Sequence, residues 1–405
     1  MAKVTVLQVV PRLDAGGSEL STVEITEALT RAGATALVAT EGGRLARAIT
    51  EGGGEIIELP VASKNPLTML ANVARFARLI REREVSLVHA RSRAPAWSAL
   101  LASRWTGRPF VTTYHGAYGD GGPIKAIYNS VMSRGDRVIA NSRFTAALIA
   151  ARQAATRDRL CVIYRGIDRA VFDLAAASQG SVERLKTAWG VPKDAKIVLL
   201  AGRLTSLKGQ RDLIAAAARV AETHGLDGAV VVMAGDAPGR DAYRQGLEDL
   251  IARHGLGDKV RLVGHCHDMP SAFRAAYVTV IASQVPETFG RTSVEAQAMG
   301  CPVIVPALGA LPETIVAAEE SPSSFTGWLM PPRNSDALAE RIGIALALSP
   351  AERAKIGARA SAHALTKFEL SRMQESTLKV YDELLGTDLA ERFARAALTA
   401  DASTS

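Results

Sequence analysis

The sequence predicts an α/β protein built from two doubly wound, Rossmann-like domains that face one another across a cleft. Short runs of β-branched and aliphatic residues alternate with alanine-rich stretches, which is the pattern of parallel strands joined by crossover helices. With 405 residues, 48% hydrophobic and 22% charged, the chain is long enough for two such domains. Ligands of these sheets bind at the carboxyl ends of the strands, so we expect the functional residues in the loops that follow strands.

The N-terminal domain is predicted over residues 1–173. Its first apolar run ends at Pro11 without a small-residue cleavage site behind it, which indicates a strand and not a signal peptide. Helices are expected at residues 19–32 and 67–82. The strands of this domain are expected at residues 4–10, 36–39, 85–89, 110–113 and 137–140.

A linker is predicted over residues 174–193, where Ser, Gly, Gln and Pro192 interrupt the alternation of strands and helices. The second domain is predicted over residues 194–385. Residues 386–405 end in small and polar residues and are expected to form a flexible tail. The strands of the second domain are expected at residues 197–201, 229–234, 260–263, 278–282 and 302–305.

Composition excludes several classes of protein. No run approaches the roughly 18 consecutive apolar residues of a membrane-spanning helix, so we expect a cytoplasmic protein. The three cysteines, Cys161, Cys266 and Cys301, lack CxxC spacing and are expected to be buried free thiols. His265 and His267 flank Cys266, but three adjacent residues rarely chelate one tetrahedral ion. The chain also lacks an Asp-x-Asp pair, so we expect neither a metal nor a cofactor.

Positive charge is concentrated in the N-terminal half. The formal net charge is +7, and the segment from Lys64 to Arg108 alone holds nine basic and two acidic side chains, an equal excess. Few aromatic residues lie in this segment and no nucleic-acid-binding module surrounds it, so nucleic acid is not an expected partner. An anionic membrane surface or a phosphorylated, acidic acceptor molecule suits the charge better.

The first strand runs into a glycine-rich loop that contains Gly16 and Gly17. A loop without side chains at a helix N-terminus presents backbone amides that suit a phosphate or a sugar hydroxyl. Because GxGxxG is absent, the loop is not a dinucleotide fingerprint, and a tight turn is the alternative interpretation.

The second domain opens with a strand followed by a loop that carries Arg203, Lys208 and Gly209. Two fixed positive charges beside a helix N-terminus are suited to a diphosphate. No GxxxxGK[ST] motif occurs, so nucleoside triphosphate hydrolysis is disfavoured.

Another loop and helix carry two glutamates, Glu287 and Glu295. Pro286 and Gly290 keep Glu287 in the loop, whereas Glu295 falls on the following helix, so both can reach one ligand over that helix's N-terminus. Carboxylates accept hydrogen bonds from sugar or ribose hydroxyls, and the backbone amides from Phe289 to Thr292 can donate to phosphate.

With these motifs the chain resembles the retaining nucleotide-sugar glycosyltransferases of family 4 (group 1), which have the two-Rossmann GT-B fold. The resemblance covers nearly the whole chain. Its further motifs are residues 112–116 (TTYHG), 140–143 (ANSR), 162–168 (VIYRGID) and 309–314 (GALPET).

The resemblance implies that the N-terminal domain binds the acceptor and the C-terminal domain binds the nucleotide sugar. It implies that Arg203 and Lys208 bind the donor diphosphate and that Glu295 takes the ribose hydroxyls. Glu287, together with the Phe289–Gly290 backbone, holds the transferred sugar in this interpretation. The nucleotide sugar is then a substrate, and no cofactor is needed.

The resemblance also assigns His115, in the loop after a strand of the first domain, to the transferred sugar, so that His115 and Glu287 are the expected catalytic residues. One position departs from the family, because Arg165 stands where Asn usually precedes the Gly-Ile-Asp element. The implied reaction is transfer of a hexose to an acceptor hydroxyl with retention of configuration, in which charge develops on the departing phosphate. Closure about the linker is expected to exclude water and suppress donor hydrolysis.

For the acceptor we rely on charge. Arg91 and Arg93 follow a strand at the cleft side of the first sheet, and we expect them to meet an acidic lipid-linked or polysaccharide acceptor, such as the inner core of lipopolysaccharide. The helix at residues 67–82 places Arg75, Arg78 and Arg81 on one face, which we expect to contact the anionic inner face of the cytoplasmic membrane. A basic surface that only keeps the protein soluble is an equal alternative.

Two other functions compete with the transferase. A non-hydrolysing nucleotide-sugar epimerase shares the architecture but turns over the donor without an acceptor. A catalytically silent sugar-nucleotide-binding protein keeps Arg203 and Lys208 but tolerates loss of His115 and Glu287. The sequence leaves the donor open among GDP-mannose, UDP-glucose and UDP-galactose, and it does not indicate an oligomeric state.

Overall fold

The structure is a computed structural model that describes residues 3–14, 16–116, 122–175, 177–223, 225–237 and 239–403, with side chains for all of these except 154, 155 and 400–403. The chain forms two compact units, one of Met1–Gly166 with Leu370–Ser405 and one of Ile167–Glu369. Among the described residues, no helix is long and apolar enough to cross a membrane.

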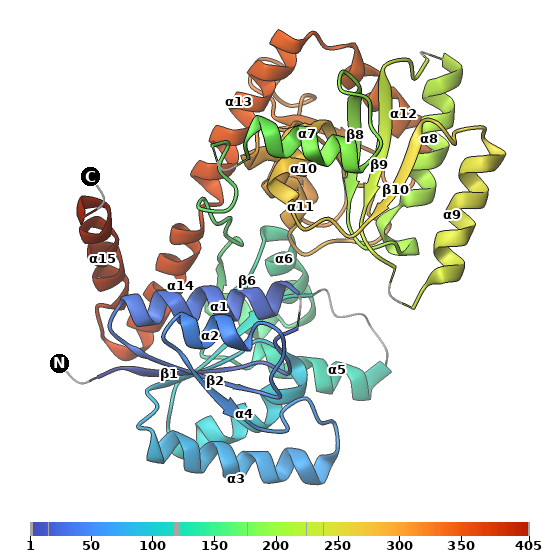
Figure 1. Cartoon of the computed structure of the whole chain (residues 1–405). Helices are drawn as coiled ribbons and strands as arrows, with labels where there is room; N and C mark the ends of the chain where they lie inside the picture. The colour runs from blue at the N-terminus through green and yellow to red at the C-terminus, as the bar shows by residue number, and fades with distance from the viewer. Residues whose placement is uncertain are drawn as a thin grey trace. The chain divides into compact units, whose positions relative to one another are not determined.

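The first unit contains a seven-stranded parallel sheet in the order β3-β2-β1-β4-β5-β6-β7 (Figure 1). In its register Leu7 lies opposite Leu37 on one side and Val88 on the other. The strands are β1 (Thr5–Val9), β2 (Thr35–Thr40), β3 (Glu55–Glu58), β4 (Leu87–Ala90), β5 (Phe110–Tyr114), β6 (Arg137–Ala140) and β7 (Leu160–Val162). The helices inserted between them are α1 (Gly17–Arg31), α2 (Ala46–Glu51), α3 (Pro66–Glu82), α4 (Arg93–Thr106), α5 (Gly122–Ser130) and α6 (Arg143–Arg152).

Both faces of this sheet are covered, because alternate residues of a strand point to opposite faces. Leu7 and Val9 of β1 pack on one face with Phe76 of α3. Val6 packs on the other face with Ile25 of α1, in the same cluster as residues of the C-terminal helices. Figure 1 shows α1 on one side of the sheet and α3 and α4 on the other.

The C-terminal helices belong to the first unit, and this corrects the predicted boundaries. Residues up to 385 were expected in the second domain and residues 386–405 as a flexible tail, but α14 (Leu370–Leu385) and α15 (Leu389–Ser403) pack on the first sheet. Tyr381 and Leu389 are fully buried there, and Phe393 is 2% exposed. The apolar stripes of these helices are local features of the sequence, but the sheet that buries them is not.

The predicted linker is also wrong, since residues 174–193 form part of the second unit. They include α7 (Gln179–Ala188), whose Val182 is buried and whose Ser181 hydroxyl accepts a hydrogen bond of 2.8 Å from the Ser271 hydroxyl of α10. The chain passes between the units at residues 166–167 and again at 369–370. Gln179 and Ser181 lie in α7 and Pro192 lies between α7 and β8, so these residues belong to one unit and do not separate two units.

The second unit contains a six-stranded parallel sheet in the order β10-β9-β8-β11-β12-β13. Its strands are β8 (Lys196–Ala201), β9 (Ala229–Ala234), β10 (Val260–Gly264), β11 (Ala276–Val280), β12 (Val303–Pro306) and β13 (Gly327–Met330). Its remaining helices are α8 (Gln210–Thr223), α9 (Asp241–Arg253), α10 (Met269–Ala275), α11 (Arg291–Ala298), α12 (Ser335–Ala347) and α13 (Pro350–Lys367).

The predicted α/β class with two Rossmann-like domains is confirmed. In each sheet the strand order reverses at one point, between β1 and β4 in the first and between β8 and β11 in the second. Loops diverge there to opposite faces and leave a crevice at the carboxyl ends of the strands, where ligands of such sheets bind. The fold therefore places the loops after β1, β4, β8 and β11 at the positions where a site is expected.

Candidate functional site

A cavity of about 530 Å³ lies at the reversal point of the second sheet. The loop after β8 supplies Arg203 and Lys208, and the loop after β11 supplies Glu287. The Lys208 Nζ lies 2.6 Å from the Glu287 Oε1, with 35% and 22% of the two side chains exposed. The structure thus brings together two predicted donor-binding residues, Arg203 and Lys208, with Glu287, which was predicted to hold the transferred sugar.

Two glycines hold the backbone of this site close to its neighbours. Gly209 has φ +71°, and a Cβ built on it lies 2.0 Å from the Ala282 carbonyl oxygen of the loop after β11. Gly290 has φ +119°, and a Cβ there lies 2.6 Å from Leu311. Any other residue at these positions strains the backbone and also collides with a packed neighbour.

The Glu287 carboxylate is fixed from several directions. It accepts hydrogen bonds from the Lys208 ammonium and from the Ser283 hydroxyl. The Glu287 backbone carbonyl accepts a bond of 2.9 Å from the amide of Ala310. A preoriented carboxylate beside a lysine can accept hydrogen bonds from hydroxyls while the lysine contacts an anion.

The other residues of the second unit predicted for the donor are on or before α11. Glu295 forms an ion pair with Arg291 at 3.0 Å, and Thr292 is half-buried in the first turn. Phe289 is buried and packs edge-on against Phe368, with 5.5 Å between ring centroids. The Phe289 side chain is therefore part of the core, and only its backbone is available to a ligand. In the described part of the chain, none of these residues lines the cavity that holds Lys208.

Arg240 and Tyr243, which line the same cavity, were missed by the sequence analysis. They lie beside and at the start of α9, and the Tyr243 hydroxyl donates a hydrogen bond of 3.1 Å to Gln210. A strand-to-helix position was the one available signal, since neither residue belongs to a recognisable motif.

In the first unit, Arg165 joins two predicted site residues. Its Nη1 lies 2.9 Å from the Nδ1 of His115, and its Nη2 donates to the backbone carbonyl of Gly17. Arg165 is 4% exposed. Gly16 precedes α1 in an extended conformation, and a Cβ built on it lies 2.5 Å from the Glu19 carboxylate.

The contact with Arg165 sets the protonation of His115. A guanidinium only donates, so Nδ1 of His115 accepts, and the hydrogen of a neutral imidazole is on Nε2. Burial and the positive charges of Arg165 and Arg91 hold the pKa of His115 well below its usual range. His115 is consequently a neutral hydrogen-bond donor near pH 7.

The two arginines predicted to bind the acceptor lie in different surroundings. Arg91 is 3% exposed, and its Nε and Nη2 donate to the Gln8 side-chain oxygen at 3.1 and 2.7 Å. Its burial is unfavourable for direct contact with an acceptor. Arg93, at the start of α4, donates to the Asn129 side-chain oxygen at 2.7 Å and lies 5.8 Å from the Tyr128 ring centroid.

A buried polar network below the site was also missed. His89 of β4 lies 2.6 Å from the Tyr381 hydroxyl of α14 and 2.7 Å from the Thr113 hydroxyl of β5. Burial and the charge of Arg91 hold the pKa of His89 well below its usual range. The network ties the C-terminal helix to the strand that leads to His115.

No cluster of three or more His, Cys, Asp or Glu side chains suited to a metal occurs in the ranges that the structure describes. The His265 and His267 rings contact each other edge-on with 4.4 Å between centroids. Independence of metal and cofactor stays a prediction from the sequence.

Comparison with known proteins gives matches along most of the chain. The model of Glycosyltransferase Family 4 matches residues 15–171, and that of Glycosyl transferases group 1 matches residues 181–363. The crystal structure of a glycosyltransferase from Rickettsia africae is 32% identical with a TM-score of 0.87, covering 96% of this chain and 100% of that chain.

More distant relatives carry more specific names. The D-inositol 3-phosphate glycosyltransferase of Mycobacterium tuberculosis is 30% identical over 308 residues, 72% of this chain and 60% of that protein. The chain thus spans about 60% of the length of the curated relatives it matches. Anabaena HepE, solved in complex with UDP and glucose, is 23% identical with a TM-score of 0.80 and shares the fold. This match covers 94% of the present chain and 100% of the HepE chain.

Proposed function

Because the chain belongs to the group 1, family 4 glycosyltransferases, we propose that it transfers a hexose from a nucleotide diphosphate sugar to an acidic, lipid-linked or polysaccharide acceptor. The acceptor is proposed to be a cell-envelope glycan such as the lipopolysaccharide core. The observation that carries the proposal is the cavity in which Arg203, Lys208 and Glu287 meet at the reversal point of the second sheet. Membership in a family of transferases favours transfer over the epimerase alternative.

The ion pair between Lys208 and Glu287 suggests how the donor binds. A diphosphate carries more negative charge than one carboxylate, so it competes with Glu287 for the Lys208 ammonium while Arg203 supplies a second cation. Glu287 then accepts hydrogen bonds from hydroxyls of the sugar. In the transition state the leaving diphosphate gains charge, and the fixed cations stabilise it. Glu295, which accepts a hydrogen bond of 3.0 Å from Arg291, accepts bonds from the ribose hydroxyls in this proposal.

His115 acts in this proposal as a hydrogen-bond donor to the transferred sugar. Because the Nδ1 of His115 accepts a hydrogen bond from Arg165, the hydrogen of the neutral ring is on Nε2. The lowered pKa of His115 keeps the ring neutral. A neutral donor at this position orients a sugar hydroxyl and adds no positive charge beside the developing oxocarbenium ion. The base and sugar of the donor are left open, and HepE's complex with UDP and glucose makes UDP-glucose the first candidate to test.

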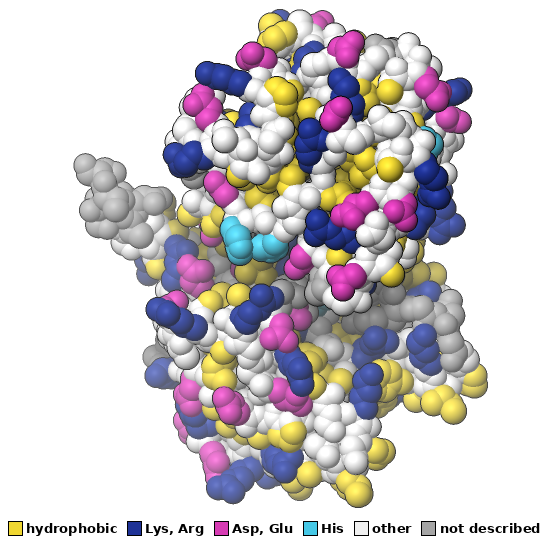
Figure 2. All heavy atoms as spheres, turned by 45° about the vertical axis from the view of Figure 1, so that its right-hand side comes forward, with side chains coloured by type: hydrophobic (Ala, Val, Ile, Leu, Met, Phe, Trp, Pro, Cys, Tyr) yellow, Lys and Arg dark blue, Asp and Glu magenta, His cyan; other side chains and the backbone are white. Residues whose placement is uncertain are grey.

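Contact with an anionic membrane is proposed at α3. Arg75, Arg78 and Arg81 lie on its exposed side, and Leu67 and Leu70 are 78% and 68% exposed near its start. Apolar side chains beside cations are typical of helices that lie in a membrane interface. On the face that Figure 2 shows, lysine and arginine side chains are spread over both units with acidic ones between them.

The test is a thermal-shift screen against nucleotide sugars and free nucleotides. A ligand at 100 times its dissociation constant stabilises by about 2.7 kcal/mol. We expect one nucleotide sugar to raise the Tm and the Arg203→Ala/Lys208→Ala variant to lose the shift. Lys259→Ala is the matched control, because Lys259 is 36% exposed and pairs with Asp227 outside the cavity. An equal shift in the double variant would refute the assignment of the site.

Transfer is then separated from epimerisation by incubating the protein with the bound nucleotide sugar alone. An epimerase converts the donor to a second nucleotide sugar without any acceptor. The proposed transferase releases at most the free sugar and nucleotide by slow hydrolysis, and formation of an epimer would overturn it.

A further inference from the structure

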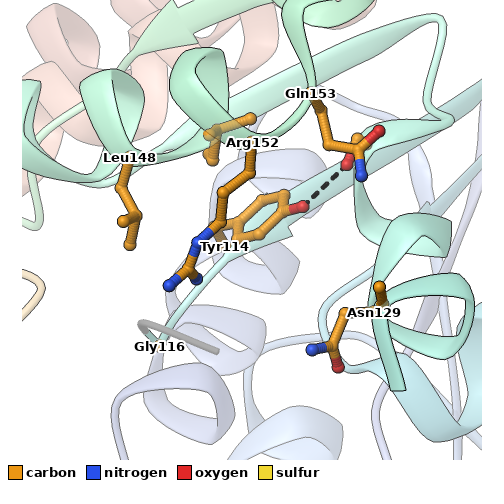
Figure 3. A pocket seen from close by; sticks show the side chains of 9 residues that line it. Tyr114, Gly116, Asn129, Leu148, Arg152 and Gln153 are labelled. Carbon is orange, nitrogen blue, oxygen red and sulfur yellow. Dashed lines mark hydrogen bonds between the residues drawn. The ribbon is translucent and has the colours of Figure 1, made fainter. Parts of the chain in front are cut away.

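A second cavity, of about 250 Å³, lies in the first unit at the carboxyl end of β5 (Figure 3). It is formed between β5, α5 and α6, and none of the nine described residues that line it is acidic. Six of these residues carry the argument: Tyr114, Asn129, Ser133, Leu148, Arg152 and Gln153.

Tyr114 forms a buried floor of the cavity. Tyr114, the last residue of β5, is 8% exposed, and its hydroxyl lies 2.9 Å from that of Ser133. Figure 3 shows the Arg152 side chain beside the Tyr114 ring, Leu148 and Asn129 on opposite sides of that ring, and Gln153 toward its hydroxyl end. An aromatic surface surrounded by both polar and aliphatic side chains is suited to a small hydroxylated ring.

Positive charge reaches the cavity from two directions. Arg152 comes from the last turn of α6 and lines the cavity directly. Arg93 donates to the Oδ1 of Asn129 at 2.7 Å, so the Asn129 amide group is oriented by a cation. Both guanidiniums oppose the rise in the pKa of Tyr114 that burial causes, which places both within electrostatic reach of its hydroxyl.

The position links this cavity to the proposed reaction. Tyr114 and Gly116, the residues on either side of His115 in the sequence, both line the cavity, whereas the His115 ring contacts Arg165. A group bound in the cavity therefore contacts the same β5 loop that carries the residue assigned by the proposed function to the transferred sugar. At about 250 Å³ the cavity is smaller than the roughly 300–1,000 Å³ of most ligand sites, so it accommodates one small unit of a larger molecule.

We propose that this cavity binds one anionic unit of the acceptor, a phosphate or carboxylate carried on a hydroxylated ring, through Arg152, Asn129 and Arg93. The proposal rests on the proposed transferase function and deepens it. It moves the expected acceptor contact from the buried Arg91 to Arg152, and it retains Arg93 in a supporting position.

The test measures binding of small anionic probes to the full-length protein by isothermal titration calorimetry. The probes are inorganic phosphate, glucose 6-phosphate and glucuronate, with glucose as the neutral control. We expect at least one anionic sugar to bind and glucose not to bind. The anionic sugar that binds more tightly shows whether the site prefers a phosphate or a carboxylate. Arg152→Gln should weaken binding by about 10- to 100-fold, as expected for loss of a charge-assisted hydrogen bond.

Two further variants make the result specific. Asn129→Asp is nearly isosteric and adds a negative charge to the cavity, so it should abolish anion binding. Arg47→Gln is the control, since Arg47 is 85% exposed and pairs with Glu51 on α2. Donor binding, measured separately by thermal shift, should be unchanged in all three variants.

The outcomes separate this proposal from the proposed function. If nucleotide sugars bind but no anionic probe does, or if Arg152→Gln and Asn129→Asp bind the probes as Arg47→Gln does, the cavity is not the acceptor site and the transferase stands. If neither donors nor anionic probes bind, the proposed function fails and this proposal fails with it.

Discussion

Replacing Arg165 tests whether the protonation of His115 is set by its neighbour. In Arg165→Asn the guanidinium that donates to His115 Nδ1 and to the Gly17 carbonyl is removed. Hydrogen bonds to charged groups contribute about 1.5–3 kcal/mol each. Without Arg165 the His115 ring loses the contact that orients it, and its hydrogen bond to the sugar is lost as well. The same energy then corresponds to a fall of about 10- to 150-fold in kcat/KM.

The pH profile gives a readout that a merely structural role would not move. The positive charge of Arg165 is one cause of the lowered pKa of His115, so its removal raises that pKa toward the usual value of about 6.5. The acid limb of the rate profile should shift to higher pH in Arg165→Asn. Arg165→Lys keeps the charge but donates as a single point, so it should restore the acid limb and only part of the rate.

The assay is hydrolysis or transfer of the nucleotide sugar that the thermal-shift screen identifies, measured between pH 5 and pH 8. Near-ultraviolet circular dichroism checks that the variants are folded. An Arg165→Asn variant with the wild-type kcat/KM and the wild-type acid limb would refute the reasoning.

Three other predictions follow from the packing and the buried histidines. Gly209→Ala should lower the free energy of unfolding by more than the roughly 1–2 kcal/mol expected for a non-glycine residue in left-handed backbone, because its Cβ would lie 2.0 Å from the Ala282 oxygen. The control is Gly255→Ala, since Gly255 has φ +65° and a Cβ there has nothing within 4 Å. Equal losses of stability in urea denaturation of the two variants would contradict the close approach at Gly209. Tyr381→Phe removes the hydroxyl 2.6 Å from His89 and should cost about 1–3 kcal/mol of stability by leaving a buried imidazole nitrogen without that partner; a Tm equal to that of wild type would count against the network. The free energy of unfolding should fall as the pH decreases through about 6.5, because the pKa values of His89 and His115 are lowered in the folded state and the unfolded chain binds these protons first. In chemical denaturation, His89→Gln should reduce the difference in stability between pH 5.5 and pH 7.5. An unchanged difference would show that other groups dominate the pH dependence.

The sequence by itself determined the class of the fold and the loops that carry the site. Buried strands such as β1 and β8 appear as short β-branched runs because both faces of a parallel sheet are covered. Their carboxyl ends then locate Arg203, Lys208 and His115 in loops without any knowledge of tertiary contacts. The edge strands β3 and β7 were missed, since both are short and lack buried residues that would give an apolar run.

Only the tertiary structure decided which distant residues meet. Lys208 and Glu287 are 79 residues apart and His89 and Tyr381 are 292 apart, and each contact exists because two loops or elements converge on one sheet. The same holds for the C-terminal helices, which carry visible apolar stripes but cover the first sheet, and for Arg91, whose charge is evident in the sequence but whose burial is not. Local patterns fix the period and the ends of an element, whereas the surface against which its apolar face packs is chosen by the whole fold.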